Sequence, residues 1–373
     1  MIQLLTVIGA RPQIIKASAI SRAIETRYRD RVCEHLLHTG QHYDANMSEV
    51  FFGELGIPTP EFNLQAGSHS HGVQTARMIE GIEQVLQAAH YDGVLVYGDT
   101  NSTLAAAIAA SKLHVPVFHV EAGLRSYNMA MPEEINRVVC DRLASLLFAP
   151  TRAAIANLEA EGANGKGQKV ILSGDVMYDN ALYFGQMAET RSRILAQQGL
   201  QKKDFVLATV HRPANTDDAL RLGAIFEALL TIAEEKKQTI VLPLHPRTRK
   251  EMETLLPEAM LHRIRACERL RILPPASYLD MICMEKNAAL VLTDSGGVQK
   301  EAFFYGTPVV ILRNETEWVE IVESGAAILA DADYTRILTA YEELLRKSVT
   351  PATLYGDGHA AEMILNELID YCA

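Results

Sequence analysis

Residues 93–125 read GVLVYGDTNSTLAAAIAASKLHVPVFHVEAGLR, and this stretch decides the fold class. It contains two apolar runs, 93–97 and 115–120, on either side of an alanine-rich segment, 102–113, that has the composition of a helix. Strands that form continuous apolar runs are typical of parallel sheets covered by helices on both faces. The stretch therefore predicts one β-α-β unit of an α/β protein.

An acid follows each apolar run, Asp99 after the first and Glu121 after the second. Open α/β sheets bind ligands at the carboxyl ends of their strands, so we expect both acids to face one crevice, where they favour proton-transfer chemistry. Two structural alternatives remain open at this point. Asp99 is equally suited to cap the helix that follows, and Glu121 can form a structural ion pair with Arg125.

Strand-then-helix units recur from one end of the chain to the other, which predicts parallel sheets with helices on both faces. A first series begins with a strand at 2–8 and a helix at 12–25. A second series supplies a sheet of its own, with expected strands at 169–173, 205–209, 239–244, 270–273, 289–293 and 308–312. The predicted fold class is α/β with two Rossmann-like, doubly wound domains.

Length and composition agree with two domains. The chain has 373 residues, of which 48% are hydrophobic and 22% charged, and this is too long for one ordinary core. A glycine-rich polar stretch, 162–167, places the hinge near residue 170. We expect a first domain at 1–170, a second at 171–357, and a final segment, 358–373, that crosses back onto the first.

Charge, hydropathy and cysteine usage exclude several classes of protein. A net charge of −11 argues against a nucleic-acid partner, although a local basic pocket for a small phosphate is compatible with it. No apolar segment approaches the ~20 residues that span a bilayer, so we expect no membrane partner. The five cysteines are scattered without CxxC spacing and follow no signal peptide, which favours free thiols and a cytoplasmic location.

The first strand is followed by GARPQIIK, residues 9–16. Pro12 suits the first turn of a helix, where Arg11 and Lys16 can converge on an anion. The alternative is a strand–helix turn with two solvated cations. The GxGxxG fingerprint follows no strand in this sequence, so a dinucleotide is disfavoured and we expect no cofactor.

A helix start is predicted at PEEINR, residues 132–137, where Glu133 and Arg137 have i,i+4 spacing. A surface salt bridge is the ordinary explanation of this spacing. The short loop before this helix leads directly from the Glu121 edge, however. We therefore expect Glu133 to lie close to Asp99 and Glu121.

Two histidines, His211 and His245, follow the expected strands 205–209 and 239–244. Scattered histidines are more often structural than catalytic, but two at the carboxyl ends of successive strands also indicate a role in binding or catalysis. No third ligand stands at metal-site spacing, so we expect no metal.

A strand-turn-helix motif is predicted at TDSGGVQKE, residues 293–301. The small residues Ser295, Gly296 and Gly297 let backbone N–H groups approach phosphate oxygens at a helix N-terminus. Glu301, one turn into the helix, can accept hydrogen bonds from a ribose diol. This context predicts a site for a nucleoside diphosphate.

Together these motifs resemble the non-hydrolysing UDP-N-acetylglucosamine 2-epimerase family over nearly the whole chain. The matching segments are 9–16, 39–42, 98–100, 119–125, 132–137, 211–212, 294–301 and 355–358. The resemblance implies two Rossmann-like domains in the glycosyltransferase-B architecture, a UDP-sugar substrate and a homodimer.

The resemblance also implies roles for individual residues. Asp99, Glu121 and Glu133 are the implied catalytic acids, and His211 is implied to assist them. The residues expected to bind substrate or UDP are Arg11, Lys16, Arg137, His245, Ser295, Gly296, Gly297, Glu301 and Arg313. In bacterial members, activation by substrate is implied at a site near Gln41 and His42.

The implied reaction inverts C2 of a UDP-2-acetamido sugar, from UDP-N-acetylglucosamine to UDP-N-acetylmannosamine, for surface polysaccharide synthesis. No carbonyl acidifies the C2 proton, so we expect UDP to be eliminated, leaving a 2-acetamidoglycal, and to be added back after protonation from the opposite face. Two faces require two acid–base groups. Repulsion between neighbouring carboxylates should keep at least one of them protonated.

Three positions depart from the usual family pattern and bear on the identity of the sugar. They are Gln13 in place of Glu, Pro213-Ala214-Asn215 in place of Arg-Glu-Asn, and Trp318 in place of Arg. The sequence around Gln13 and Trp318 is similar to that of a branch of the family that acts on UDP-2,3-diacetamido-2,3-dideoxyglucuronic acid, the alternative substrate. More remote alternatives are a UDP-sugar glycosyltransferase, a hydrolysing epimerase and a non-catalytic nucleotide-sugar sensor.

Overall fold

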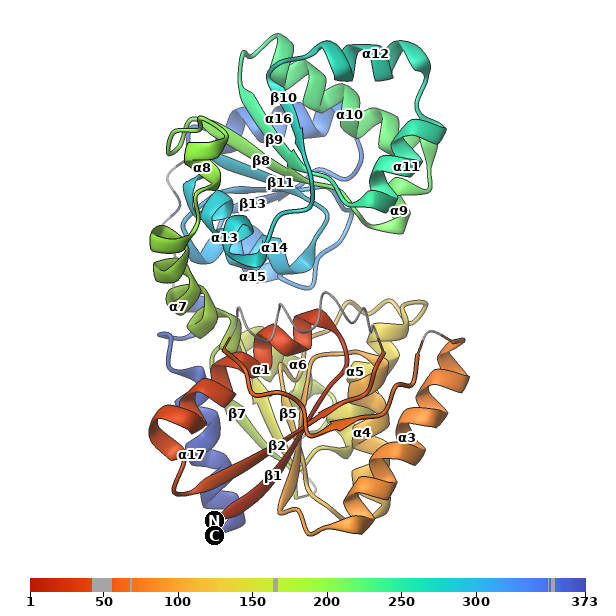
Figure 1. Ribbon diagram of the computed structural model, residues 1–373, viewed down its shortest axis with the longest axis vertical. Coiled ribbons are helices and arrows are strands. Elements are labelled where there is room, and N and C mark those ends of the chain that lie inside the picture. The colour runs from red at the N-terminus through yellow and green to blue at the C-terminus, as the bar shows by residue number, and fades with distance from the viewer. Residues whose placement is uncertain (42–55, 68, 164–166, 348, 350–352) are drawn as a thin grey trace. The chain divides into compact units, whose positions relative to one another are not determined.

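A computed structural model describes residues 1–41, 56–67, 69–163, 167–347, 349 and 353–373. The chain divides into two compact units, Met1–Asn180 with Thr353–Ala373 and Ala181–Ala352 (Figure 1). The division falls inside helix α7 (Val176–Arg191), whereas the sequence placed it near residue 170. The C-terminal helix α17 (Ala360–Cys372) belongs to the first unit, where Asp179 accepts hydrogen bonds from the first two N–H groups of this helix.

Among the described residues, the first unit contains a seven-stranded parallel sheet in the order β3-β2-β1-β4-β5-β6-β7. Its strands are β1 (Ile2–Ile8), β2 (Val32–His38), β3 (Phe62–Asn63), β4 (Gly93–Tyr97), β5 (Val117–Val120), β6 (Leu146–Ala149) and β7 (Lys169–Leu172). The strand order reverses between β1 and β4, and such a switch point is where open sheets bind ligands.

Helices cover this sheet on both faces. They are α1 (Arg11–Ala23), continued by the π-helical turn η1 (Ile24–Tyr28), α3 (His71–Ala88), α4 (Asn101–Lys112), α5 (Pro132–Leu143), α6 (Arg152–Ala160) and α17, with a 3₁₀ turn η2 (Thr353–Tyr355) before the last. Helix α4 is buried along most of its length, because its alanines allow β4, α3 and α5 to approach closely.

Strand β7 corrects one expectation. The sequence assigns 169–173 to the second sheet, but β7 pairs in parallel with β6, from Leu146 opposite Lys169 to Ala149 opposite Leu172. Helix α6 connects β6 to β7 and returns the chain to the same sheet. The stretch 162–167 therefore lies inside the first unit, between α6 and β7.

The second unit contains, among the described residues, a six-stranded parallel sheet in the order β10-β9-β8-β11-β12-β13. Its strands are β8 (Phe205–Thr209), β9 (Thr239–Pro243), β10 (Leu270–Leu273), β11 (Leu290–Thr293), β12 (Val309–Ile311) and β13 (Ala327–Leu329). Besides α7, its helices are α8 (Ile194–Gln197), α9 (Pro213–Thr216), α10 (Ala219–Glu234), α11 (Pro246–Leu255), α12 (Glu258–Ala266), α13 (Tyr278–Asn287), α14 (Gly296–Phe304), α15 (Val319–Glu323) and α16 (Tyr334–Leu344). The predicted fold class is confirmed, and this sheet has its switch point between β8 and β11.

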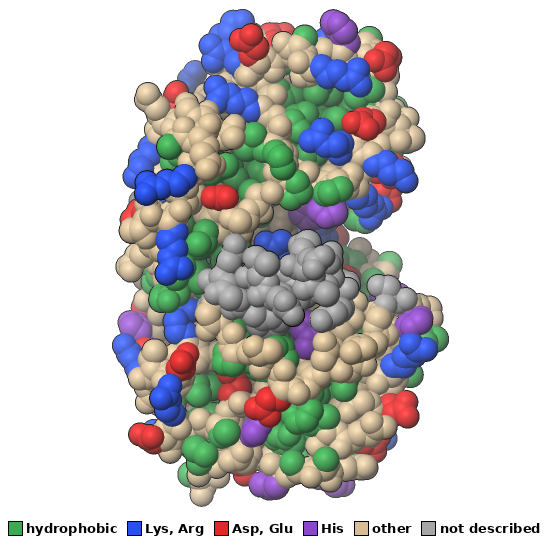
Figure 2. Space-filling model, viewed as in Figure 1, with side chains coloured by type: hydrophobic (Ala, Val, Ile, Leu, Met, Phe, Trp, Pro, Cys, Tyr) green, Lys and Arg blue, Asp and Glu red, His purple; other side chains and the backbone are tan. Residues whose placement is uncertain are grey.

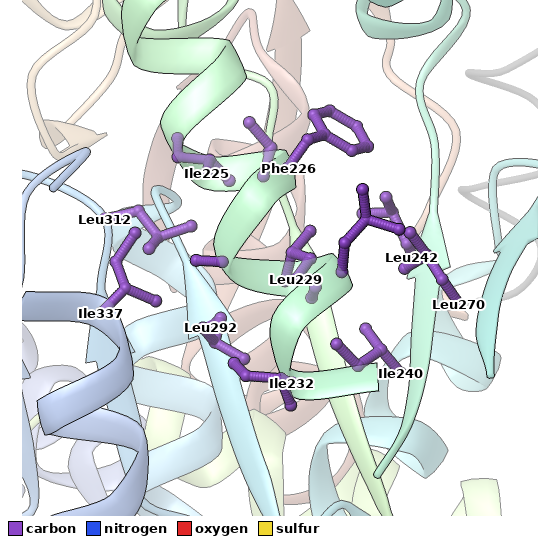
Figure 3. Packing of buried hydrophobic residues seen from close by; sticks show 14 of the residues in the cluster. Ile225, Phe226, Leu229, Ile232, Ile240, Leu242, Leu270, Leu292, Leu312 and Ile337 are labelled. Atoms are coloured by element: carbon purple, nitrogen blue, oxygen red, sulfur yellow. The ribbon is translucent and has the colours of Figure 1, made fainter. Parts of the chain in front are cut away.

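The core of the second unit lies where α10 packs on the sheet (Figure 3). Leu229 on α10 and Leu292 on β11 are both fully buried in this cluster, which also receives Ile337 from α16. Leu220 starts the same helix but is 85% exposed. Leu229 and Leu220 of α10 thus form a matched pair of one buried and one exposed side chain.

Leu229→Ala is expected to lower the free energy of unfolding of the second unit by about 2–5 kcal/mol, because it removes buried methyl groups and leaves a cavity. Leu220→Ala is the control and should change it by less than about 0.5 kcal/mol. Denaturant unfolding followed by the fluorescence of Trp318, the single tryptophan, reports on this unit because Trp318 is buried within it. Equal effects of the two variants would contradict the packing described.

Surface charge is mixed over both units. In the view of Figure 2, Lys and Arg side chains are interspersed with Asp and Glu side chains on the described surface.

The five cysteines are free, and Cys140 and Cys283 are buried. Within the described ranges, no helix combines the length and the hydropathy that a membrane span requires.

Candidate active site

The two acids singled out by the sequence lie at the ends of adjacent strands of the first unit. Strands β4 and β5 pair up to Tyr97 opposite Val120, so Asp99 and Glu121 follow the same edge of the sheet. Glu121 Oε2 forms an ion pair with Lys16 Nζ from α1, and both side chains are largely buried. Gly98 allows this pair, because a Cβ on Gly98 would lie 3.0 Å from Lys16 Nζ and 3.1 Å from Glu121 Oε2.

Glu121 adopts a left-handed backbone conformation with φ of 72°. Such a conformation costs a non-glycine residue about 1–3 kcal/mol and is found most often at functional sites. It is maintained here because the N–H groups of Glu121 and Ala122 both donate to the Phe148 carbonyl, at 3.1 and 3.0 Å. The alternative ion pair of Glu121 with Arg125 is not formed, since Arg125 binds Asp141 and Glu161 instead.

Asp99 is not the cap of helix α4. Thr100 takes that role and accepts a hydrogen bond from the Thr103 N–H, which leaves the Asp99 carboxylate to pair with Arg137 Nη2. Burial raises the pKa of Asp99, Arg137 and Lys16 act to lower it, and Glu121 acts to raise it. Asp99 therefore takes up a proton at a higher pH than an ordinary aspartate, as suits an acid–base group.

Gln13, one of the departures from the family pattern, organises the turn between β1 and α1. Its Oε1 accepts from the N–H groups of Gly9 and Ala10, at 2.9 and 3.2 Å, and its Nε2 donates to the Tyr97 carbonyl at 3.0 Å and to Thr103 Oγ1 at 2.9 Å. A glutamate carboxylate at this position has no hydrogen to donate to a carbonyl. The amide therefore joins β1 to the end of β4, next to Asp99.

Arg11 and Lys16, the residues expected to bind an anion, both belong to helix α1. Arg11 is exposed at the first residue of α1, while the Lys16 ammonium contacts the carboxylate of Glu121. Lys16 therefore pairs with one of the two acids at the sheet edge, and its role in binding an anion stays a prediction. A direct role for Arg11 in substrate binding stays a prediction.

Glu133 is exposed in the first turn of α5, and its neighbour Glu134 makes the contacts with the site. Glu134 is 1% exposed, accepts from the N–H groups of Ser126 and Tyr127 at 3.0 and 2.9 Å, and binds Arg137 Nη1 at 2.8 Å. Burial acts to raise the pKa of Glu134, but these hydrogen bonds and Arg137 hold it below its ordinary value. Arg137 thus links Glu134 to Asp99 instead of forming the expected surface pair with Glu133. A catalytic role for Glu133 stays a prediction.

The sequence contained a signal for Glu134 that hydrophobic patterning does not show. Glu134, Arg137 and Asp141 recur at spacings of three and four residues, so they share one face of α5, and all three are buried. A helix face that is buried and charged has no apolar periodicity. The alternation of opposite charges at these spacings is the pattern that identifies it.

In the second unit, Asp294 at the end of β11 is fully buried and fixes the loop that follows β8. Its carboxylate accepts from the N–H groups of His211 and Arg212 at 3.1 and 3.0 Å and from Asn215 Nδ2 at 3.1 Å. The imidazole Nδ1 of His211 also lies 3.4 Å from Asp294 Oδ1. The sequence placed Asp294 in a motif but not in the site.

His211 is a neutral imidazole near neutral pH. Burial lowers its pKa, Asp294 acts in the opposite direction, and Arg212 and His245 act in the same direction as burial. About half of the His211 side chain is exposed, so it can still reach a ligand. His245 caps helix α11, with Nδ1 accepting from the Arg247 N–H at 3.3 Å, and its predicted binding role is untested.

The N-terminus of α14 has the features predicted for a phosphate site. Within the described part of the chain, no side chain caps this nine-residue helix, and Ser295 at its N-cap donates its own N–H to Thr293 Oγ1 at 2.9 Å. A Cβ added to Gly296 would lie 3.6 Å from Trp318 Nε1 and 3.9 Å from Arg212 Nη2. Glu317 Oε2 lies 3.9 Å from the same Cβ, and this carboxylate is paired with Arg313. The N–H groups of the first turn therefore stand beside the donors of Trp318 and Arg212, an arrangement that favours an anion.

Glu301 lies within α14, and Arg313 follows strand β12. Glu301 is largely buried, and the Tyr278 hydroxyl donates to its Oε1 at 3.4 Å. Arg313 forms a bidentate pair with Glu317, with both N–O distances 3.0 Å. Trp318, another departure from the family pattern, has the Lys300 ammonium 3.8 Å from its ring centroid, a cation–π contact. Arg313 thus orders the segment that carries Trp318.

The expected regulatory residues fall at the edge of the described chain. Gln41 is buried, and its Oε1 accepts from the Ser102 N–H and hydroxyl at 3.1 and 2.7 Å, which ties it to the first turn of α4. His42 lies outside the described residues. Among those described, no group of three His, Cys, Asp or Glu side chains has the arrangement of a metal site.

Two Rossmann-like units, one with paired acids at its switch point and one with an open helix N-terminus, define a two-domain α/β enzyme class. A family model for UDP-N-acetylglucosamine 2-epimerase matches residues 24–369. The chain belongs to this family, as the sequence predicted.

Relatives and solved structures agree over the full length. A UDP-2,3-diacetamido-2,3-dideoxy-D-glucuronate 2-epimerase of Pseudomonas aeruginosa is 48% identical over 98% of this chain and 99% of its own. A UDP-N-acetylglucosamine 2-epimerase of Methanocaldococcus jannaschii is 40% identical, covering 97% of both chains.

The crystal structure of the Methanocaldococcus jannaschii enzyme with UDP-GlcNAc and UDP matches with a TM-score of 0.88 at 40% identity, covering 98% of this chain and 99% of that chain. The Neisseria meningitidis UDP-GlcNAc 2-epimerase bound to UDP-GlcNAc matches with a TM-score of 0.86 at 28% identity, covering 99% and 100%. These likenesses support the predicted glycosyltransferase-B type of fold.

Proposed function

We propose that this protein inverts C2 of a UDP-2-acetamido sugar without hydrolysing it. The observation that carries the proposal is the pair of acids at adjacent strand ends, Asp99 and Glu121, held by Arg137 and Lys16 in one group of alternating charges. Membership of the family and the raised pKa of Asp99 support it. The pair supplies two acid–base groups, which an inversion through two faces requires.

The chemical steps balance without a redox partner. One carboxylate takes the C2 proton, the C–H electron pair forms a C1–C2 double bond, and the C1–O bond to UDP breaks. The 2-acetamidoglycal then receives a proton on the other face of C2 from the second carboxyl group, and a diphosphate oxygen bonds again to C1. Lys16 and Arg137 stabilise the carboxylates that exchange the proton.

We assign UDP binding to the second unit. The N–H groups at the start of α14 and the Arg212 guanidinium bind the diphosphate, and Glu301 accepts hydrogen bonds from the ribose diol. We place the half-exposed His211 ring beside the departing phosphate, with its Nδ1 next to the Asp294 carboxylate. Asp294 fixes the backbone of His211 and Arg212 for this purpose.

A specific observation favours the diacetamido sugar as the natural substrate. The relative at 48% identity is named for UDP-2,3-diacetamido-2,3-dideoxy-D-glucuronate, whereas the archaeal relative named for UDP-N-acetylglucosamine is 40% identical. Gln13 and Trp318 both have specific partners in the structure, Thr103 and Lys300, so these departures are built into the fold. The inverted centre is C2 with either sugar.

The test offers both sugar nucleotides to the protein in deuterated buffer and follows C2 by proton NMR. We expect inversion with deuterium at C2, no accumulation of free UDP, and a higher kcat/KM for the diacetamido substrate. Accumulation of free UDP would indicate a hydrolysing epimerase. Turnover that requires an added acceptor would indicate a glycosyltransferase, and unchanged stereochemistry at C2 would indicate a non-catalytic sensor. Inversion without deuterium at C2 would rule out the proposed chemistry.

A further inference from the structure

A fully buried histidine lies beneath the candidate acids. His119, on β5, is 0% exposed, and both of its ring nitrogens have partners. Nε2 lies 2.8 Å from the carbonyl oxygen of Gly98, and Nδ1 lies 2.7 Å from Asp141 Oδ1 on α5. Gly98 immediately precedes Asp99, and His119 stands two residues before Glu121.

These contacts determine the protonation of the ring. A carbonyl oxygen only accepts, so Nε2 carries a hydrogen. Asp141 is ionised, because its other oxygen receives Arg125 Nη1 at 2.8 Å and the Gly123 N–H at 3.1 Å, and Nδ1 must then donate to it. Burial acts to lower the pKa of His119, but Cys140 and Asp141 raise it well above its ordinary value.

The charged and titratable groups around the ring come from three sides. Asp141 and Cys140 face it from α5, and Arg125 approaches Asp141 from the loop after β5. Arg125 is in turn held by Glu161, which follows α6, with two hydrogen bonds of 2.7 Å. The four charged groups alternate in sign, so the imidazolium is compensated although it is buried.

We propose that His119 is a positioning residue for the epimerase reaction, whose imidazolium ties the Gly98 carbonyl to Asp141 and so fixes Asp99 relative to Glu121. This inference rests on the proposed function. Gly98 packs against the Lys16–Glu121 pair, so a shift of Gly98 displaces Asp99 and disturbs that pair together. A neutral imidazole has one N–H group and would lose one of the two contacts.

Two variants separate positioning from folding. His119→Phe keeps a ring but removes both donors, and we expect kcat to fall by about 10- to 100-fold with KM for the UDP-sugar little changed, because small displacements of reacting groups are costly. His119→Gln keeps one donor nitrogen, which can reach the Gly98 carbonyl but not Asp141 as well, and should recover part of the lost kcat. Thermal unfolding and calorimetric UDP binding of both variants provide the control for folding.

Nitrogen NMR tests the inference without measuring the activity of a variant. Nitrogen NMR of the wild-type protein labelled at its 12 histidines, with His119→Gln used for assignment, should show both His119 nitrogens protonated over a pH range above the ordinary histidine pKa of about 6.5. A neutral His119 in this range, an unchanged kcat in folded His119→Phe, or no recovery in His119→Gln would each overturn the inference. Failure of wild-type protein to exchange deuterium at C2 would instead count against the proposed function, and the NMR result would stand.

Discussion

Asp99→Asn and Glu121→Gln are each expected to lower kcat by about 10²–10⁴-fold, the range by which acid–base groups contribute to catalysis. Each substitution keeps the shape of the side chain but removes the group that exchanges a proton with C2. UDP binding should be unchanged, because the residues assigned to UDP belong to the second unit. Turnover of both sugar nucleotides and calorimetric titration with UDP measure the two properties separately.

The matched control is Glu25→Gln, which removes a carboxylate of the first unit whose side chain is 59% exposed. Its kcat should equal that of the wild type. The wild type should also lose activity on the acid side, because the Asp99 carboxylate is present above its raised pKa and is lost as pH falls through that value. A fully active Asp99→Asn variant, with or without this pH dependence, would remove Asp99 from the mechanism.

Asp294→Ala is expected to lower the free energy of unfolding of the second unit by about 3–5 kcal/mol. The substitution leaves the N–H groups of His211 and Arg212 and the amide of Asn215 without their shared buried acceptor, and each such loss costs about 1–3 kcal/mol. Trp318 fluorescence during denaturant unfolding measures the change. UDP affinity should fall as well, because the loop that carries His211 and Arg212 is no longer fixed.

Asp204→Ala is the control for this prediction, since Asp204 is exposed just before β8 in the same unit. It should shift the unfolding midpoint little. Asp294→Asn should fall between the two, because an amide oxygen still accepts some of the hydrogen bonds. If Asp294→Ala were as stable as Asp204→Ala, the buried carboxylate would not be what holds the β8 loop.

The apolar runs identified most strands because buried parallel strands need apolar side chains on both faces. Runs such as 93–97 and 205–209 coincide with β4 and β8. The same argument failed for the sheet membership of β7, because an apolar run does not record which neighbour it pairs with. Short strands such as β13 (Ala327–Leu329) carry too few residues to form a pattern.

The sequence predicts the candidate acids because they stand where the chain leaves a strand. It does not predict the residues with which these acids pair. Asp99 and Glu121 follow apolar runs, whereas the sequence does not single out the buried Glu134 beside the exposed Glu133, whose catalytic role stays a prediction. The choice between these adjacent acids depends on which face of α5 is turned to the sheet. Asp141 and Asp294 were overlooked as site residues for a related reason, since each is identified only by the distant donors that converge on it.

By itself, the sequence determined the α/β class and the strand ends that carry the acids, because these follow from local patterns of apolar and polar residues, and its motifs identified the family by resemblance. Only the tertiary structure decided which charges meet. Lys16 and Glu121 stand 105 residues apart, and Arg137 and Asp99 stand 38 apart. Such pairs form when parallel strands bring their carboxyl ends to one edge, and the resulting burial and opposite charges then set the protonation of each group.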